Sequence, residues 1–244
     1  MARWRDCVLL GLFDANDLPK HLIESIFHQR AGRPIDSFVL RKVISSILAL
    51  SSGSAPPSKP SLGLLYPTFL TALLRDTHHF YTRSSIDYLS RKPVVDYIDI
   101  VTTTLAREGM IAQADLPDFS RMQYIDVCKG ALIKAHLVIL QSEFARLLEV
   151  KDEKNLKALY ALLSRVKEGL SSLPDIFCEH IKKEGQAAMA AIVSGKEDKD
   201  TDATDYVNNL ALVHERFWAL AKRCLNDDKA FLTSVDKVSS CIPL

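Results

Sequence analysis

Three short groups of His, Cys and acidic residues are the places where this chain could do chemistry. Imidazole, thiolate and carboxylate groups bind metal ions or transfer protons when several of them converge on one point. The groups are Asp76 with His78 and His79, Cys178 with Glu179 and His180, and His214 with Glu215 and Arg216.

The spacing within these groups argues against a shared site on a helix. Helical zinc sites repeat their ligands four residues apart, as in H-E-x-x-H, because residues i and i+4 lie on one face. Asp76 and His78 are two residues apart, and so are Cys178 and His180. We therefore predict structural roles, with His180 partly buried on the apolar stripe of its helix. His214 is expected on an exposed charged face beside Phe217 and Trp218.

The remaining sequence contains no motif for catalysis or cofactor binding. There is no nucleophile elbow, G-x-G-x-x-G, phosphate loop or H-E-x-x-H. With nine glycines, the chain is poorly suited to loops that cradle phosphate through backbone amides. The basic pairs at 165–167 and 182–183 are interrupted by Glu168 and Glu184, which indicates solvated faces rather than a nucleic-acid site. We predict no catalytic, cofactor-binding or metal-binding residue, no cofactor, and no enzymatic activity.

The elements that would position these residues are helices. Apolar residues repeat with a period of about 3.6 across nearly every interval between glycines and prolines, and no strand pattern is present. The sequence therefore predicts an all-α protein. The expected helices span residues 3–13, 17–31, 36–51, 66–90, 93–115, 119–149 with a bend near Gly130, 153–168, 171–193, 204–225 and 227–240.

Helix starts and loops carry recognisable signals. N-terminal caps or first-turn residues are expected at Asp17 with Pro19, at Asp36 and at Asp227. The polar stretches Ser51 to Ser61 and Ser194 to Thr204 are expected to be solvated loops. Aromatic side chains along one long helical region are expected mostly in the core: Tyr66, Phe69, Phe80, Tyr81 and Tyr88.

Composition limits the compartment and the class of partner. The 244 residues include 31 basic and 30 acidic side chains, so the global charge of +1 attracts neither nucleic acid nor anionic lipid. Five widely spaced cysteines without a C-x-x-C pair suit reduced thiols. No stretch approaches the roughly 20 apolar residues of a membrane span. We expect a cytoplasmic or nuclear protein.

The segment from Asn155 to Ala188 is the most informative part of the chain. Two apolar helical stripes meet there at Gly169, which we expect to be a hinge that ends the first helix. Its sequence, LYALLSRVKEGL followed by FCEHIKKEGQAA, resembles the third N-terminal repeat of the cullin family. Further segments resemble successive parts of a cullin N-terminal region of the cullin-1 type: WRDC at 4–7, HQRAGRPID at 28–36, FYTRSSIDYLSRKPVVDYI at 80–98 and residues 205–238.

The resemblance implies an elongated rod of stacked multi-helix cullin repeats. Residues 1–150 would hold the end of the first repeat and the second repeat, and residues 151–244 the third. The chain would be a rigid, non-catalytic scaffold segment of a cullin-RING (SCF-like) E3 ubiquitin ligase. It would space the substrate receptor from the ubiquitin-loading module, in company with ligase subunits and cullin regulators.

The resemblance also implies what the segment lacks. WRDC matches the end of the first repeat, so we expect the adaptor-docking helices and the C-terminal RING-binding region to be absent, and we assign no adaptor-binding residue. A helical rod of the vesicle-tethering kind is the alternative, because its bundles share the same periodicity. A helical enzyme or small-molecule binder would need converging histidines and carboxylates, which the sequence does not place together.

Overall fold

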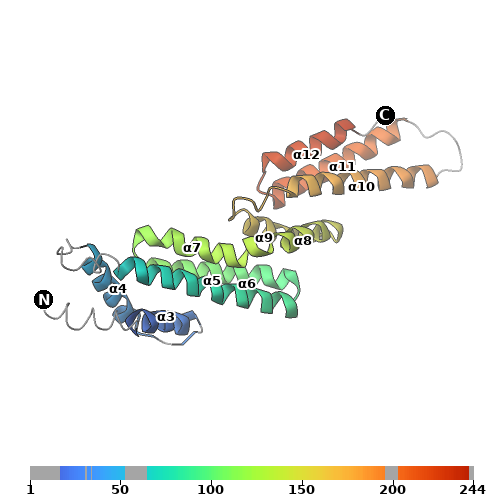
Figure 1. Cartoon of the computed structure of the whole chain (residues 1–244). Coiled ribbons are helices and arrows are strands. Elements are labelled where there is room, and N and C mark those ends of the chain that lie inside the picture. Colours follow the sequence, from blue (N-terminus) through green and yellow to red (C-terminus); the bar gives the residue numbers. More distant parts are fainter. Residues whose placement is uncertain (1–16, 31, 34, 53–64, 196–202, 242–244) are drawn as a thin grey trace, which may run out of the picture. The chain divides into compact units, whose positions relative to one another are not determined.

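The computed structural model describes residues 17–30, 32–33, 35–52, 65–195 and 203–241. Within these ranges the chain forms helices and no strand, which confirms the predicted all-α class. The helices are α3 (Asp17–Arg30), α4 (Ser37–Ser52), α5 (Leu65–Arg91), α6 (Val94–Asp115), α7 (Asp118–Leu132), the 3-10 helix η3 (Lys134–His136), α8 (Leu137–Glu149), α9 (Glu153–Leu163), α10 (Leu173–Gly195), α11 (Ala203–Cys224) and α12 (Lys229–Cys241) (Figure 1).

Some predicted features lie outside the described residues. These are the helix over 3–13, the WRDC segment, and the central parts of both polar stretches, 53–61 and 196–202. The ends of the two stretches were wrongly assigned to loops, because α4 continues to Ser52, α10 continues to Gly195 and α11 begins at Ala203. Prolines sit where the sequence indicated, near helix starts: Pro67 is the third residue of α5 and Pro174 the second of α10.

The chain divides into two compact units, which are described separately. Unit 1 comprises residues 1–90 and 103–132, and unit 2 comprises residues 91–102 and 133–244. Helix α6 contributes residues up to 102 to unit 2 and residues from 103 onwards to unit 1.

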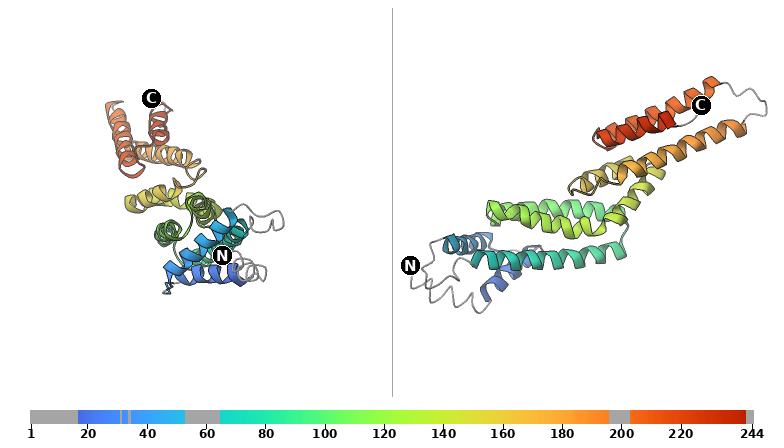
Figure 2. Two further views of the ribbon diagram at one scale, coloured as in Figure 1. Left: turned by 90° about the vertical axis from the view of Figure 1, so that its left-hand side faces the viewer. Right: turned by 45° about the horizontal axis from the view of Figure 1, so that its top comes forward.

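In unit 1, α5, α6 and α7 lie side by side (Figures 1 and 2). Phe69 and Leu73 of α5 are fully buried in this unit. The Tyr66 hydroxyl lies 2.7 Å from Ser120 Oγ, which joins α5 to α7. Of the five aromatic residues predicted for the core, Tyr66, Phe69 and Tyr81 are buried, Phe80 is half-buried and Tyr88 is 39% exposed.

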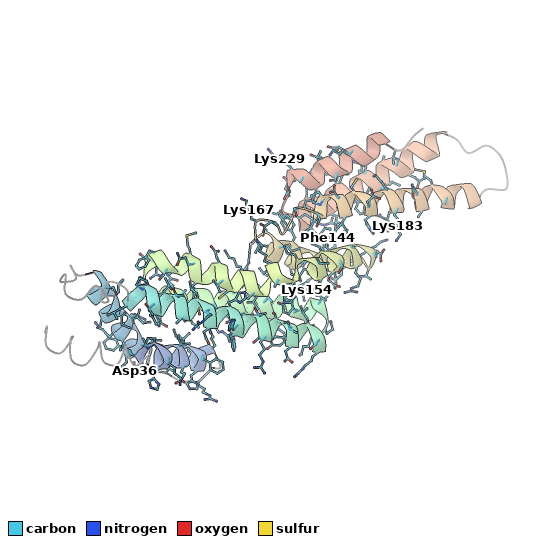
Figure 3. The ribbon with its side chains drawn as sticks, in the orientation of Figure 1. Asp36, Phe144, Lys154, Lys167, Lys183 and Lys229 are labelled. Atoms are coloured by element: carbon cyan, nitrogen blue, oxygen red, sulfur yellow. The ribbon has the colours of Figure 1, made fainter. Side chains whose placement is uncertain are left out.

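Unit 2 is organised around an aromatic cluster contributed by four helices. The ring of Phe231 on α12 lies 6.1 Å from that of Phe144 on α8, 5.9 Å from Tyr160 on α9 and 5.6 Å from Phe177 on α10. Phe144, Phe177 and Phe231 have no solvent exposure. The charged side chains labelled in Figure 3, such as Lys154, lie by contrast at the surface.

Helix caps explain where several helices begin. Asp36 Oδ1 accepts hydrogen bonds from the amides of Phe38 and Val39 at 3.1 Å, which confirms this residue as the cap of α4. The predicted cap of α12 was one residue too early. Asp228 accepts from the amide of Ala230 at 2.9 Å, because Asp227 is in the left-handed region with a φ of 55° and belongs to the preceding turn.

The predicted helix over 119–149 is interrupted, and not at the expected residue. Gly130 stays helical, and the break lies three to six residues later, where η3 separates α7 from α8. Ala131, Leu132 and Ile133 are all buried. Three successive residues of an α-helix spread over more than half of its circumference. The change of direction at η3 directly follows this buried stretch.

The predicted helix over 153–168 ends early, at Leu163, and Gly169 lies in the following turn rather than at a helix end. A Cβ atom on Gly169 would lie 2.1 Å from the backbone oxygen of Leu163. The turn folds back so closely that only glycine fits there. Gln141 Nε2 donates to the Gly169 carbonyl at 3.4 Å, which ties this turn to α8.

Gly169→Ala is expected to destabilise the protein by about 1–3 kcal/mol, because the added methyl meets backbone rather than a movable side chain. The matched control is Gly109→Ala within α6, where a Cβ meets nothing within 4 Å. That control should stabilise by about 0.5–1 kcal/mol through helix propensity. Urea denaturation of both variants provides the comparison, and equal effects of the two substitutions would refute the close approach at Gly169.

Candidate functional site

A cluster of buried polar side chains lies between four helices of unit 1. Arg30 at the end of α3 and Glu108 in α6 have side chains with no solvent exposure, and Arg30 Nε lies 3.7 Å from Glu108 Oε2. Arg30 Nη2 donates to Thr77 Oγ1 at 2.5 Å and to the Tyr124 hydroxyl at 2.9 Å. The hydroxyls of Tyr81 and Tyr124 each donate to one carboxylate oxygen of Glu108 at 2.5 Å. We call these five residues the buried polar cluster.

Aromatic rings complete the surroundings of the Arg30 guanidinium. Its carbon lies 5.4 Å from the ring centres of Phe80 and Tyr81 and 5.9 Å from that of Tyr124, within the range of cation–π attraction. Arg30 Nη1 also lies 3.5 Å from Asp76 Oδ2. The cation is thus held from several sides at once.

The two tyrosines of this cluster stay protonated. Burial raises the pKa of Tyr81 and of Tyr124 well above the ordinary value for tyrosine, and the nearby Glu108 carboxylate raises both further. Burial likewise raises the pKa of the Cys128 thiol to about 12. Both hydroxyls therefore remain protonated donors, and the thiol is not a nucleophile near neutral pH. The cluster joins α3 to α5, α6 and α7.

The groups proposed from the sequence lie apart from one another. Asp76 faces Arg30, whereas the neighbouring His78 and His79 are exposed, with ring centres 6.2 Å apart. Cys178 and His180 are both half-buried on α10. Across the described ranges, no group of three or more His, Cys, Asp or Glu side chains could hold a metal ion.

His214 and its neighbours on α11 are more tightly engaged than an exposed charged face would be. The His214 ring stacks on Trp218 at 5.5 Å, and its Nε2 lies 3.3 Å from Asp236 Oδ1. Arg216 pairs with Glu184 of α10 and lies over the ring of Phe217, which is buried. The prediction of an exposed charged face is confirmed for Glu215 and Arg216, whereas His214 is half-buried. The neighbouring Phe217 is buried, and its ring packs on Phe177.

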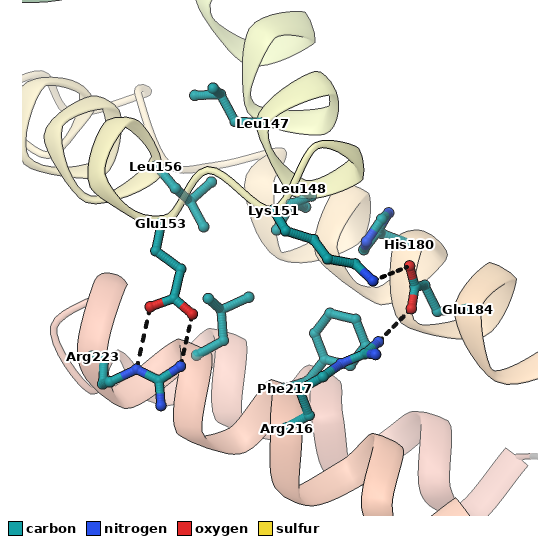
Figure 4. Close-up of a pocket in the computed structure, with 11 residues that line it drawn as sticks. Leu147, Leu148, Lys151, Glu153, Leu156, His180, Glu184, Arg216, Phe217 and Arg223 are labelled. Atoms are coloured by element: carbon teal, nitrogen blue, oxygen red, sulfur yellow. Dashed lines mark hydrogen bonds and ion pairs between the residues drawn. The ribbon is translucent and has the colours of Figure 1, made fainter. Parts of the chain in front are cut away.

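A pocket in unit 2 lies where the turn after α8 meets α9, α10 and α11 (Figure 4). Five of its eleven lining residues are apolar: Leu147, Leu148, Leu156, Phe217 and Leu220. Charged side chains surround these apolar residues and form ion pairs with one another (Figure 4). Arg223 donates to Glu153 at 2.8 and 3.3 Å, and Glu184 lies between Arg216 and Lys151, the latter 3.9 Å away.

His180 also lines this pocket, with its ring 5.7 Å from that of Phe217. Burial lowers the pKa of His180 below its ordinary value, although Glu184 and Glu149 act in the opposite direction. The folded pKa is thus lower than the unfolded one, and the unfolded state binds more protons between the two values. The contribution of neutral His180 to stability is therefore fully present above the unfolded pKa and is lost as the pH falls from there through the folded pKa.

We expect the melting temperature to fall when the pH is lowered from about 7.5 to below about 6.5, the ordinary pKa of histidine. His180→Gln should reduce this fall. Burial also lowers the pKa of His136, so part of the pH dependence should remain and should decrease further in the double variant with His136→Gln. A melting temperature that rises on acidification over this range would contradict the depressed pKa of His180.

Comparison with known proteins decides the family. The family model described as the cullin alpha solenoid domain matches residues 1–242. The chain belongs to the cullin family. This confirms the resemblance found in the sequence. The general role of cullins is that of a scaffold in cullin-RING E3 ubiquitin ligases.

Individual cullins are similar over almost the whole chain. It is 27% identical to Cullin-1 of Dictyostelium discoideum over 96% of its length, and 27% identical to Cullin-1 of Schizosaccharomyces pombe over 97%. It is 23% identical over 90% of its length to Cell division control protein 53 of Saccharomyces cerevisiae. The chain spans about 30% of the length of these relatives. In the described part of this cullin chain, no helix is long and apolar enough to cross a membrane.

Sequence reasoning missed the Arg30–Glu108 pair, although a signal was present. Leu22, Ile26 and Arg30 are spaced four residues apart, and the first two are buried. Glu108 follows the buried Leu105 by three residues on α6. A charged residue at an apolar stripe position is unusual and indicates a buried counter-charge. Which charge pairs with which could be seen only in the folded chain.

Proposed function

We propose that this cullin chain is a non-catalytic scaffold segment of a cullin-RING E3 ubiquitin ligase of the SCF-like type. The family match over residues 1–242 is the observation that carries the proposal. The partners would be other ligase subunits and cullin regulators, and the role suits the cytoplasm or nucleus. Membership of the cullin family favours this role over the vesicle-tethering alternative.

The proposed contribution of the segment is a fixed spacing between the substrate receptor and the ubiquitin-loading module. Interlocked helices resist bending because their close-packed side chains cannot slide independently. Both units contain close packing of this kind. In unit 2 the ring of Phe231 contacts rings from three other helices, and in unit 1 the buried polar cluster joins four helices. Helix α6 contributes residues to both units and contains no proline. An uninterrupted helix suits a stiff connection.

The repeat organisation proposed for the segment places a boundary near residue 150. Residues 1–150 would hold the end of the first cullin repeat and the second repeat, and residues 151–244 the third. The chain reverses at this point: Lys151 has a φ of 58°, and Asp152 caps α9 by accepting from the Asn155 amide at 3.1 Å. A sharp turn followed by a capped helix is a suitable start for a new repeat.

A chimera tests the scaffold role directly. Residues 1–242 would replace the matched segment of Schizosaccharomyces pombe Cullin-1, and substrate ubiquitination would be measured with the reconstituted ligase. The proposal predicts that the chimera retains activity within about tenfold of the parent. A chimera that folds and assembles with the ligase subunits but leaves the substrate unmodified would refute the spacer role.

Thr103→Pro is expected to break the proposed stiffness, because proline inside a helix removes a hydrogen bond and costs about 3 kcal/mol. Thr103 is exposed in the middle of α6. Spin labels on non-canonical amino acids at Arg83 in unit 1 and Glu179 in unit 2 would report the distance between the units. The unmodified chain and the Thr103→Ala control should give one narrow distance distribution, and Thr103→Pro a severalfold broader one. A broad distribution in the unmodified chain would rule out a rigid spacer.

A further inference from the structure

The apolar pocket of unit 2 has a basic hollow beside it, and the two share Arg223. The hollow lies between α9 and α11 and is lined in part by Lys157, Lys222 and Asn226. No carboxylate lines it. Lys157 and Lys222 form no ion pair with any residue in the described part of the chain. The hollow therefore presents two ammonium groups that no described carboxylate pairs with, of which that of Lys222 lies 5.5 Å from the ring centre of Trp218.

Arg223 is held in place between the two spaces rather than left free. Its Nε and Nη2 donate to Glu153, which also accepts a hydrogen bond from Cys224 Sγ at 3.8 Å. An incoming anion would therefore be bound mainly by Lys157 and Lys222. Arg223 would separate this anion from whatever occupies the apolar side.

The apolar space has a size that limits its occupant. It amounts to about 80 Å³. An engineered apolar cavity of about 150 Å³ accepts benzene. The smaller space suits a branched aliphatic group such as the side chain of Leu or Val. Leu220 and Phe217 would contact this group, and the ion pairs at the rim would shield it from water.

From this arrangement we propose that unit 2 binds an acidic segment of a protein partner, which inserts one aliphatic side chain into the apolar pocket and places Asp or Glu side chains over Lys157 and Lys222. The surface and the segment have complementary charge, and the pocket supplies an anchor of the kind that dominates protein interfaces. The proposal does not depend on the scaffold role, because it rests only on groups within unit 2.

The test uses the full chain and a defined probe, the acetylated peptide Ser-Asp-Glu-Leu-Asp-Glu-Ser. Titration followed by NMR should show saturable shifts at Leu220 and Phe217, with affinity that falls as salt is added. Changing the peptide's Leu to Ser should weaken binding at least about tenfold, and so should replacing its acids with Asn and Gln. Equal binding of the Leu and Ser peptides, or equal binding of inorganic phosphate alone, would overturn the proposal.

Variants of the chain assign the binding to this surface. Lys157→Glu combined with Lys222→Glu changes only exposed residues and should abolish detectable binding. Leu220→Trp should fill the apolar pocket and weaken binding at least about tenfold, with folding checked by circular dichroism. The matched control is Lys20→Glu on α3, an exposed charge reversal in unit 1, which should leave binding within twofold. If Lys20→Glu weakens binding as much as the paired reversal, the attraction is non-specific and the proposal fails.

Discussion

Replacement of Arg30 by Met is expected to lower the free energy of unfolding by about 3–5 kcal/mol. The guanidinium supplies the counter-charge of Glu108, and both side chains are fully buried. Met preserves much of the volume but leaves the carboxylate without its cation and removes the donor to Thr77 and Tyr124. The cost is thus mainly that of an uncompensated charge inside unit 1. Urea denaturation followed by circular dichroism measures it.

A neighbouring arginine provides the control for Arg30. Arg107 Nε lies 4.0 Å from Glu108 Oε1, but its side chain is 45% exposed. Solvent screens such a pair, so Arg107→Met should cost less than about 1 kcal/mol. The double variant Arg30→Met with Glu108→Gln should lose less stability than the sum of its single variants, because it leaves no buried charge behind. Additive losses would show that Arg30 acts through packing rather than as a counter-charge.

The helices could be predicted from the sequence because burial imposes a period that the residue types reveal. α3, α5 and α6 were each predicted to within one residue at both ends. The stripe Leu156, Leu159, Tyr160 and Leu163 is buried as expected. A period in residue type does not, however, show where the backbone turns. Val166 continues the stripe in the sequence, yet the helix has already ended at Leu163.

The interiors of the two units depend on residues far apart in the sequence, which is why their chemistry could not be predicted. Arg30 meets Glu108 only after α3 and α6 have packed in unit 1. Gly169 was recognised as a break, but the reason for glycine is a carbonyl six residues earlier, which no local pattern reveals. His180 was correctly placed as half-buried from its stripe position. The partner that packs against it, Phe217, comes from another helix.

Phe231→Ala is expected to destabilise the protein by about 3–5 kcal/mol, the largest effect anticipated in unit 2. Phe231 is fully buried, and its ring contacts those of Phe144, Tyr160 and Phe177. Removal of the ring deprives three other helices of a common contact and leaves a cavity that these aromatic side chains cannot fill together. The measurement is the urea midpoint, compared with that of the unmodified chain.

The same packing supplies a control for Phe231→Ala and defines the result that would contradict the prediction. Leu212 on α11 is 63% exposed, so Leu212→Ala should change stability by no more than about 0.5 kcal/mol. Phe231→Leu retains more of the buried volume and should cost less than Phe231→Ala, because the residual cavity is smaller. If Phe231→Ala costs no more than Leu212→Ala, α12 does not pack on α8, α9 and α10 in solution. In that case the stiffness attributed to unit 2 has no physical basis, since a spacer cannot be rigid around a core that tolerates the loss of its central ring.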